Sequence, residues 1–380
     1  MHSPIGETSF PSANPHHPAS SFLQENPSMS HRELGRRQFC QLAGAGLGAL
    51  CLPSLSFGED AVEKKNLFTD EFGKAPEFVP GSFTLAVLPD TQHYCQKWNQ
   101  HFYNQTQWIA DNAERYNIKD VLHLGDITNR NARDQWKVAR KAMSTLDGKV
   151  PYAMVPGNHD YGLNGGSKDR DTFFNEYFSF DQYSQQKTFG GAYEDGRLES
   201  NYHTFRAGDQ DFLILGLEWG PRDQVVEWAN KIAEKHPDHR KILITHAYMY
   251  FDETRYDYKK YGKKQTWNPK TYANGRLKGG ANDGEDLWNK LVSKHPNFIM
   301  TFNGHVLNDG LGRMASEGAS GKNVHQMLVN YQMKHEGGEG FMRLVEFQPD
   351  GKSAQIKAYS PSLNGYKVDS QNQFVLQLDA

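Results

Sequence analysis

The stretch Val150-Pro-Tyr-Ala-Met-Val-Pro-Gly-Asn-His-Asp160 decides how the rest of the chain is interpreted. Its apolar first half is typical of a buried strand, and Pro156-Gly157 ends that strand. Asn158, His159 and Asp160 then present an amide, an imidazole and a carboxylate. In an open α/β sheet, ligands collect at such strand ends. A polar turn with an Asx-type hydrogen bond fits these residues equally well. The residues at the other strand ends therefore indicate whether this stretch is a ligand-binding site or a polar turn.

Apolar runs alternate with helical patterns along most of the chain. The runs lie at 83–88, 121–124, 150–155, 212–217, 241–245 and 298–302. The helices between them are expected at 102–116, 132–146, 222–235 and 285–294. This alternation predicts βαβ units with parallel strands. From residue 324 to 378 short alternating segments are joined by turns, which indicates an antiparallel β ending.

Two stretches interrupt the alternation. Residues 161–205 and 248–284 are rich in Gly and aromatic side chains and show no clear period. We expect both to run over the strand ends, where they would shape the choice of substrate. The globular domain is expected at 81–380, after a charged linker at 59–80.

The first 58 residues have a different character. Residues 1–30 are rich in Ser, Pro, His and Asn, which predicts disorder. Gly35-Arg-Arg-Gln-Phe39 precedes a weakly apolar, glycine-rich run, and this resembles a twin-arginine export signal. A membrane anchor or a lipid attachment at Cys51 is the alternative, but the apolar run is short for a bilayer span. We expect cleavage near Ser56–Gly58 and a periplasmic or extracellular mature protein.

Composition narrows the class of partner. The 380 residues carry a formal net charge of −3, so a basic surface for bulk nucleic-acid binding is not indicated. Cys95 alone remains after the expected cleavage, so no internal disulfide is expected. No stable membrane span is expected in the mature form, and the sequence leaves the oligomeric state open.

Five apolar runs end in polar groups of one chemical kind. These groups are Asp90 and Gln92, then Asp126, Asn158, His246 and His305. Carboxylate, amide and imidazole groups are ligands for divalent ions such as Mn²⁺, Fe, Zn²⁺ or Mg²⁺. A carboxylate can bridge two ions, and two ions can hold a phosphate between them.

In this order the motifs resemble the calcineurin-like metallophosphoesterase superfamily. They are Asp90-x-Gln92, Gly125-Asp126, Gly157-Asn-His-Asp160, Thr245-His246 and Gly304-His305. The resemblance implies an α/β fold in four layers, with a central β-sandwich of mixed sheets flanked by helices. It also implies two divalent metal ions and hydrolysis of a phosphomonoester or phosphodiester by metal-activated hydroxide.

The resemblance also implies a role for each residue. Asp126 would bridge both ions, with Asp90 and Gln92 on the first ion. Asn158, His246 and His305 would hold the second ion. His159 would contact the substrate as a general acid or transition-state stabiliser, and Asp160 would orient it.

Two positions depart from the family pattern. Gln92 stands where the family usually has histidine, and Leu307 stands where a second histidine would complete Gly-His-x-His. The first ion would therefore be bound weakly, with a preference for Mn²⁺, Fe or Mg²⁺. Either Asn308 or Asp309 replaces the missing ligand, or Asn308-Asp-Gly310 is a plain turn.

The sequence thus predicts an exported metal-dependent phosphoesterase acting on a small phosphate ester. Two alternatives stay open. One is a metal- or ligand-binding relative without turnover, which Leu307 would explain. The other is a surface or carbohydrate module that binds through its aromatic excursions.

Overall fold

The structure is a computed structural model that describes residues 72–379. The predicted export signal, and residues 59–71 of the predicted linker, lie outside the described residues. Phe72–Gly73, also predicted as linker, form strand β1 and pair with β14 (Gly365–Lys367). No helix within 72–379 has the length and apolarity needed to cross a bilayer.

The first sheet contains three of the predicted apolar runs as parallel neighbours. These are β2 (Phe83–Leu88), β3 (Ile118–His123) and β4 (Tyr152–Met154). The order across the sheet is β1-β14-β13-β12-β2-β3-β4. The remaining strands are antiparallel: β12 (Met342–Phe347), β13 (Ser353–Ser360) and β15 (Gln373–Gln377), which pairs with β13.

The second sheet contains the other three runs, in the order β10-β11-β9-β8-β7-β6-β5. Its parallel strands are β7 (Gln210–Leu217), β8 (Arg240–Thr245), β9 (Phe298–Asn303) and β11 (Asn323–Val329). Its antiparallel edges are β10 (Leu311–Glu317), β6 (Asn201–Ala207) and β5 (Phe189–Ala192). The predicted antiparallel ending is therefore wrong for β11, which runs parallel to β9.

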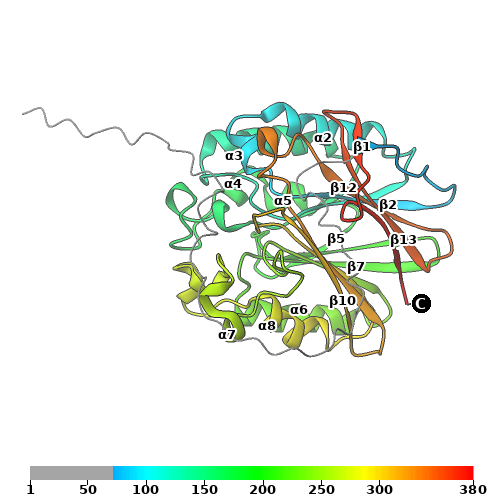
Figure 1. Cartoon of the computed structure of the whole chain (residues 1–380). Helices are drawn as coiled ribbons and strands as arrows, with labels where there is room; N and C mark the ends of the chain where they lie inside the picture. The colour runs from blue at the N-terminus through cyan, green and yellow to red at the C-terminus, as the bar shows by residue number, and fades with distance from the viewer. Residues whose placement is uncertain (1–71, 380) are drawn as a thin grey trace, which may run out of the picture. The chain divides into compact units, whose positions relative to one another are not determined.

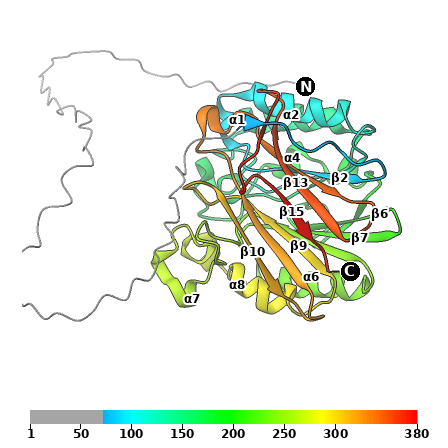
Figure 2. The same ribbon diagram turned by 45° about the vertical axis from the view of Figure 1, so that its right-hand side comes forward.

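Helices cover the outer face of each sheet (Figures 1 and 2). Along β2, Leu85 and Val87 belong to the core between the sheets, whereas Ala86 and Leu88 pack with α2 (Asn99–Asp111) and α3 (Arg133–Met143). This alternation follows from the two-residue period of a strand whose faces are both buried. On the second sheet, α6 (Asp223–Lys235) and α8 (Gly284–Leu287) cover β7. The predicted four-layer α/β fold is confirmed.

The predicted excursions consist of short helices, with one exception. The end of 161–205 forms β5 and enters β6, so it completes the edge of the second sheet. The short helices within the excursions are α4 (Phe174–Tyr177), α5 (Phe180–Tyr183), α7 (Tyr258–Tyr261), η3 (Leu163–Gly165), η4 (Gly262–Lys264), η5 (Pro269–Thr271) and η6 (Asn274–Arg276). Those elsewhere in the described residues are α1 (Gln92–Gln96), η1 (Ser144–Leu146), η2 (Asn158–Asp160), η7 (Trp288–Val292) and η8 (His335–Gly337).

Candidate metal centre

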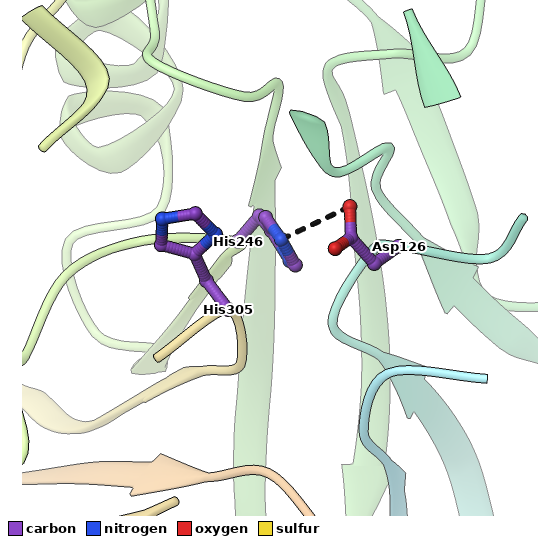
Figure 3. Close-up of side chains that lie close together, drawn as sticks. All are labelled: Asp126, His246 and His305. Carbon is purple, nitrogen blue, oxygen red and sulfur yellow. Dashed lines mark ion pairs between the residues drawn. The ribbon is translucent and has the colours of Figure 1, made fainter. Parts of the chain in front are cut away.

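The polar residues singled out in the sequence lie at the carboxyl ends of parallel strands from both sheets. Asp126 follows β3 in the first sheet, while His246 and His305 follow β8 and β9 in the second. One ligand atom from each of these three side chains lies within 4.8 Å of the others, and all three residues are buried. Figure 3 shows the His246 ring beside the Asp126 carboxylate, with His305 next to it. The edge where the two sheets meet is therefore the candidate site.

His246 is held with one ring nitrogen free. Its Nδ1 atom is 2.8 Å from the Leu124 carbonyl oxygen, so Nδ1 carries the proton and donates. Its Nε2 atom lies 3.2 Å from Asp126 Oδ1, yet this pair lacks the geometry of a hydrogen bond. Metal-binding histidines characteristically donate their second nitrogen to a carbonyl or carboxylate in this way.

His305 has the same arrangement with its nitrogens exchanged. Its Nε2 atom donates to the Trp267 carbonyl oxygen at 2.9 Å, which leaves the Nδ1 lone pair unused. Its ring lies 4.9 Å from the His246 ring and 4.8 Å from the buried Trp219 ring, centroid to centroid. Each histidine thus has one ring nitrogen held by a backbone carbonyl and the other facing the site, where it would offer a lone pair to a metal ion once neutral.

Two amides lie at the other end of the site, beside Asp90. Asn330 donates from Nδ2 to Asp90 Oδ2 at 3.1 Å, and the Gln92 Nε2 atom donates to Gln332 Oε1. Asn330 and Gln332 follow β11, and their involvement was missed in the sequence. The signal was present, because a polar group again follows an apolar run. Only the parallel pairing of β11 with β9 brings that strand end to this edge.

The buried charges of the site need a positive partner. Burial raises the pKa of the Asp90 carboxyl to about 8. Burial opposes ionisation of Asp126 as well, but the nearby His246 charge lowers the Asp126 pKa below its ordinary value. Burial alone would lower the pKa of His246, yet Asp126 and Asp90 raise it to about 9. In the metal-free chain, protons therefore supply the positive charge that a bound cation would bring and displace.

The unused acceptors fit a divalent ion. Gln92 Oε1, Asn158 Oδ1 and His246 Nε2 are buried and have no hydrogen-bond partner within residues 72–379. Leaving such atoms unpaired is costly unless something outside the protein binds them. Oxygen and imidazole nitrogen donors suit Mn²⁺, Fe, Zn²⁺ or Mg²⁺, and the buried Cys95 is not among these acceptors.

Backbone constraints explain the residue types around the ligands. A Cβ atom on Gly157 would lie 2.2 Å from Asp126 Oδ1, and one on Gly304 would lie 2.0 Å from Asp90 Oδ1. Asp126 and His305 adopt left-handed backbone conformations, with φ of +44° and +73°. Non-glycine residues are strained in the left-handed backbone region, and such strained residues concentrate at functional sites.

His159 is half-buried and is oriented by a backbone carbonyl. Its Nδ1 atom lies 2.9 Å from the Asn129 oxygen, and its backbone N–H donates to Asp126 Oδ1 at 2.9 Å. The predicted orienting contact from Asp160 is wrong. The Asp160 carboxylate instead accepts from the N–H groups of Ile127, Thr128 and Gly157 and from the Thr128 hydroxyl, at 2.7–3.0 Å. Asp160 therefore fixes the loop after β3. These contacts give it a positioning role in place of the predicted catalytic one.

Asn308 does not join the buried cluster. It lies exposed in a turn, where the Gly310 N–H donates to the Leu307 carbonyl, and its φ is +71°. The Asp309 carboxylate accepts from the Leu311 N–H at 3.2 Å. The turn interpretation therefore replaces the prediction of Asn308 as a metal ligand, and Asp309 also serves the turn.

Comparison with known proteins now decides the family. Residues 83–309 match the family described as calcineurin-like phosphoesterase, and this span exceeds half of the chain. The chain belongs to the calcineurin-like phosphoesterase family. This family implies a site for two divalent ions, in agreement with the donor atoms described above.

Two relatives align with parts of this calcineurin-like phosphoesterase. Uncharacterized protein YvnB of Bacillus subtilis is 31% identical over 314 residues, which cover 78% of this chain and 22% of that protein. Probable glycerophosphodiester phosphodiesterase GpdQ of Arcobacter nitrofigilis is 25% identical over 127 residues, 33% of this chain and 40% of that protein. The chain thus spans less than half the length of either relative.

Three solved structures are similar to this chain at low sequence identity. Purple acid phosphatase PPD1 from yellow lupin (Lupinus luteus) has a TM-score of 0.46 and 14% identity, covering 78% of this chain and 54% of its own. GAP50, the anchor in the inner membrane complex of Plasmodium, has a TM-score of 0.44 and 9% identity, and the match covers 79% of this chain and 90% of that chain. NAD nucleotidase NadN of Haemophilus influenzae has a TM-score of 0.38 and 12% identity, and the match covers 78% of this chain and 50% of that chain.

The correction of Asp160 leads to a prediction about stability. Asp160→Ala leaves three buried backbone N–H groups without an acceptor, at about 1–3 kcal/mol each, so the unfolding free energy should fall by about 3 kcal/mol or more. Urea denaturation measures this loss, with the exposed Asp195→Ala as a control expected to change it by less than about 0.5 kcal/mol. If Asp160→Ala keeps its stability but loses activity, Asp160 has a catalytic role instead.

Proposed function

We propose that the protein hydrolyses phosphomonoesters or phosphodiesters with the help of two divalent metal ions. The observation that carries this proposal is the group of unpaired buried acceptors around Asp126, next to a half-buried histidine. Membership of the calcineurin-like phosphoesterase family supports it.

The second ion would be held by Asp126, Asn158, His246 and His305. The first ion would be held by Asp90, Gln92 and the bridging Asp126, with no ligand from the Leu307 turn. When bound, two such ions neutralise the charge of a phosphate group and activate water as the nucleophile.

Gln332 and Asn330 would position the ligands of the first ion. Because Gln332 Oε1 accepts from Gln92 Nε2, the Gln92 amide has its oxygen left for the ion. Asn330 binds Asp90 through its amide nitrogen, and its amide oxygen accepts from the Gln332 N–H at 2.9 Å. The strand end after β11 would thus compensate for the missing histidine at 307.

His159 would act on the substrate. The Asn129 carbonyl fixes its Nδ1–H, so its Nε2 atom remains for a phosphoryl oxygen or the leaving oxygen. In the imidazolium form Nε2–H donates to the charge that develops there, which is the role of a general acid or transition-state stabiliser. The contact between its backbone N–H and Asp126 ties this histidine to the metal ligands.

The activity test uses p-nitrophenyl phosphate and bis-p-nitrophenyl phosphate with added Mn²⁺. The wild-type protein should hydrolyse at least one of them. His159→Ala should lower kcat by about 10²–10⁴-fold, the usual contribution of a general acid, while elemental analysis finds its metal content unchanged.

The control for this test is His325→Ala, a histidine in β11 far along the strand from its carboxyl end. It should retain activity. Retained metal without turnover of either ester in the wild-type protein would favour the metal-binding relative that lacks catalysis. Equal losses of metal and turnover in His159→Ala would make His159 a ligand.

Gln332 offers a test of the first ion alone. Gln332→Ala should lose about one of two bound ions because Gln92 is no longer held, and Gln332→Glu should keep both since a carboxylate also accepts from Gln92 Nε2. Elemental analysis after gel filtration measures the content, with the exposed Gln210→Ala as control. Two tightly held ions in Gln332→Ala would contradict this role.

We also propose that the chain is exported through its paired arginines, Arg36 and Arg37. Replacing both with lysine should keep the uncleaved precursor inside the cell, because such signals are read by a receptor that requires the arginine pair. Cell fractionation followed by mass spectrometry of the N-terminus measures this. Normal export and cleavage of the Arg36→Lys/Arg37→Lys double variant would contradict export through the paired arginines.

A further inference from the structure

A groove of about 570 Å³ is lined in part by Gln332, the residue that binds the candidate metal ligand Gln92. Three segments form its walls: the start of α1 and the turn after it, the loop after β3, and the segment after β11. His93, Arg130 and Gln332 each line one of these three walls. The groove therefore collects side chains from the same strand ends as the metal centre.

Contacts join the groove to the catalytic groups. Gln332 lines it and binds Gln92. Arg130 lines it and directly follows Asn129, whose carbonyl holds the His159 ring. Gln332 and Arg130 therefore place the groove next to residues that hold Gln92 and His159.

The charge of the groove is positive. Lys97 and Arg130 are exposed, and neither forms an ion pair within residues 72–379. Glu336 is the one carboxylate among the residues that line the groove, and its Oε2 atom lies within hydrogen-bond distance of His101 Nε2, at 2.8 Å; Lys97 and Arg130 thus outnumber it. Unpaired cations on a concave surface attract anions.

The groove also has an apolar face. Trp98 lies edge-on to His93, with 6.4 Å between ring centroids, and the Lys97 Nζ atom is 4.8 Å from the Trp98 ring centre. Met333 is 61% exposed, although methionine is commonly buried. An indole and a thioether form an adaptable surface for a flat ring.

A second polar pocket lacks this character. The pocket next to Tyr161 is lined by arginines that are paired with glutamates, among them Arg222 with Glu218 at 2.7 Å. Its charges compensate one another, as in a structural ion-pair network. The groove at Lys97 and Arg130 keeps its charge for a ligand.

We propose that this groove binds the organic group of the substrate, and that this group combines a flat apolar ring with a second negative charge. The inference rests on the proposed phosphoesterase function, because the metal centre would hold the phosphate itself. Lys97 and Arg130 recognise the second charge, and Trp98 and Met333 contact the ring. These residues determine specificity and take no part in the bond cleavage.

The test compares two phosphonates that the enzyme cannot hydrolyse. Phenylphosphonate and 4-carboxyphenylphosphonate share the ring and the metal-binding group and differ in one carboxylate. Titration calorimetry of the Mn²⁺-loaded wild-type protein should find 4-carboxyphenylphosphonate bound about 3- to 10-fold more tightly, since each exposed ion pair contributes up to about fivefold.

Variants assign this preference to the groove. In Lys97→Ala/Arg130→Ala the ratio of the two Kd values should fall to about 1, because the two cations that recognise the carboxylate are removed. The matched control Lys149→Ala/Lys187→Ala removes two exposed lysines from a different pocket and should keep the wild-type ratio. Trp98→Ala should weaken both ligands by a similar factor.

Salt provides a readout that needs no variant. Raising KCl from about 50 to about 500 mM should reduce the wild-type ratio, because screening shortens the range of exposed charges. Equal Kd values in the wild-type protein, an unchanged ratio in Lys97→Ala/Arg130→Ala, or an equal loss in the lysine control would each overturn the groove assignment. Absence of ester hydrolysis alongside a charge preference would instead reject only the proposed catalysis.

Discussion

The contact between Asp126 and His246 joins the two halves of the molecule at the candidate metal centre. Asp126 follows a strand of the first sheet and His246 follows a strand of the second, and the atoms Oδ1 and Nε2 are 3.2 Å apart. Both side chains are buried, so their charges are poorly solvated and depend on each other. A site formed in this way requires the two sheets to pack in one register.

Backbone carbonyls control the imidazoles around this contact. Leu124 holds His246, Trp267 holds His305, and Asn129 holds His159, at 2.8–2.9 Å in each case. Each bond selects a tautomer and so decides which nitrogen faces the site. A carbonyl gives this control without adding another charge, which matters where Asp90 and Asp126 already lie close together.

The sequence predicted the fold, and it marked strand ends whose residues Asp126, His246 and His305 lie together in the structure, because its signals are local. An apolar run that ends in a polar residue is visible at Asp90, Asp126 and His246 without knowledge of the pairing of strands. Partners distant in the chain were not predictable in the same way. Asp160 binds backbone N–H groups about thirty residues away, for example Ile127. Gln332 reaches Gln92 only because β11 is parallel to β9, and strand direction is set by the tertiary fold rather than by the local pattern.

The most direct test of this account is the Mn²⁺ stoichiometry of the wild-type protein and of Asp126→Ala, measured by elemental analysis on folded, gel-filtered samples. If Asp126 bridges the two ions, the wild-type chain binds about two and the variant binds close to none, because both ions lose a shared carboxylate. Loss of about one ion, or of none, would contradict a bridging role for Asp126 and with it the proposed two-metal centre.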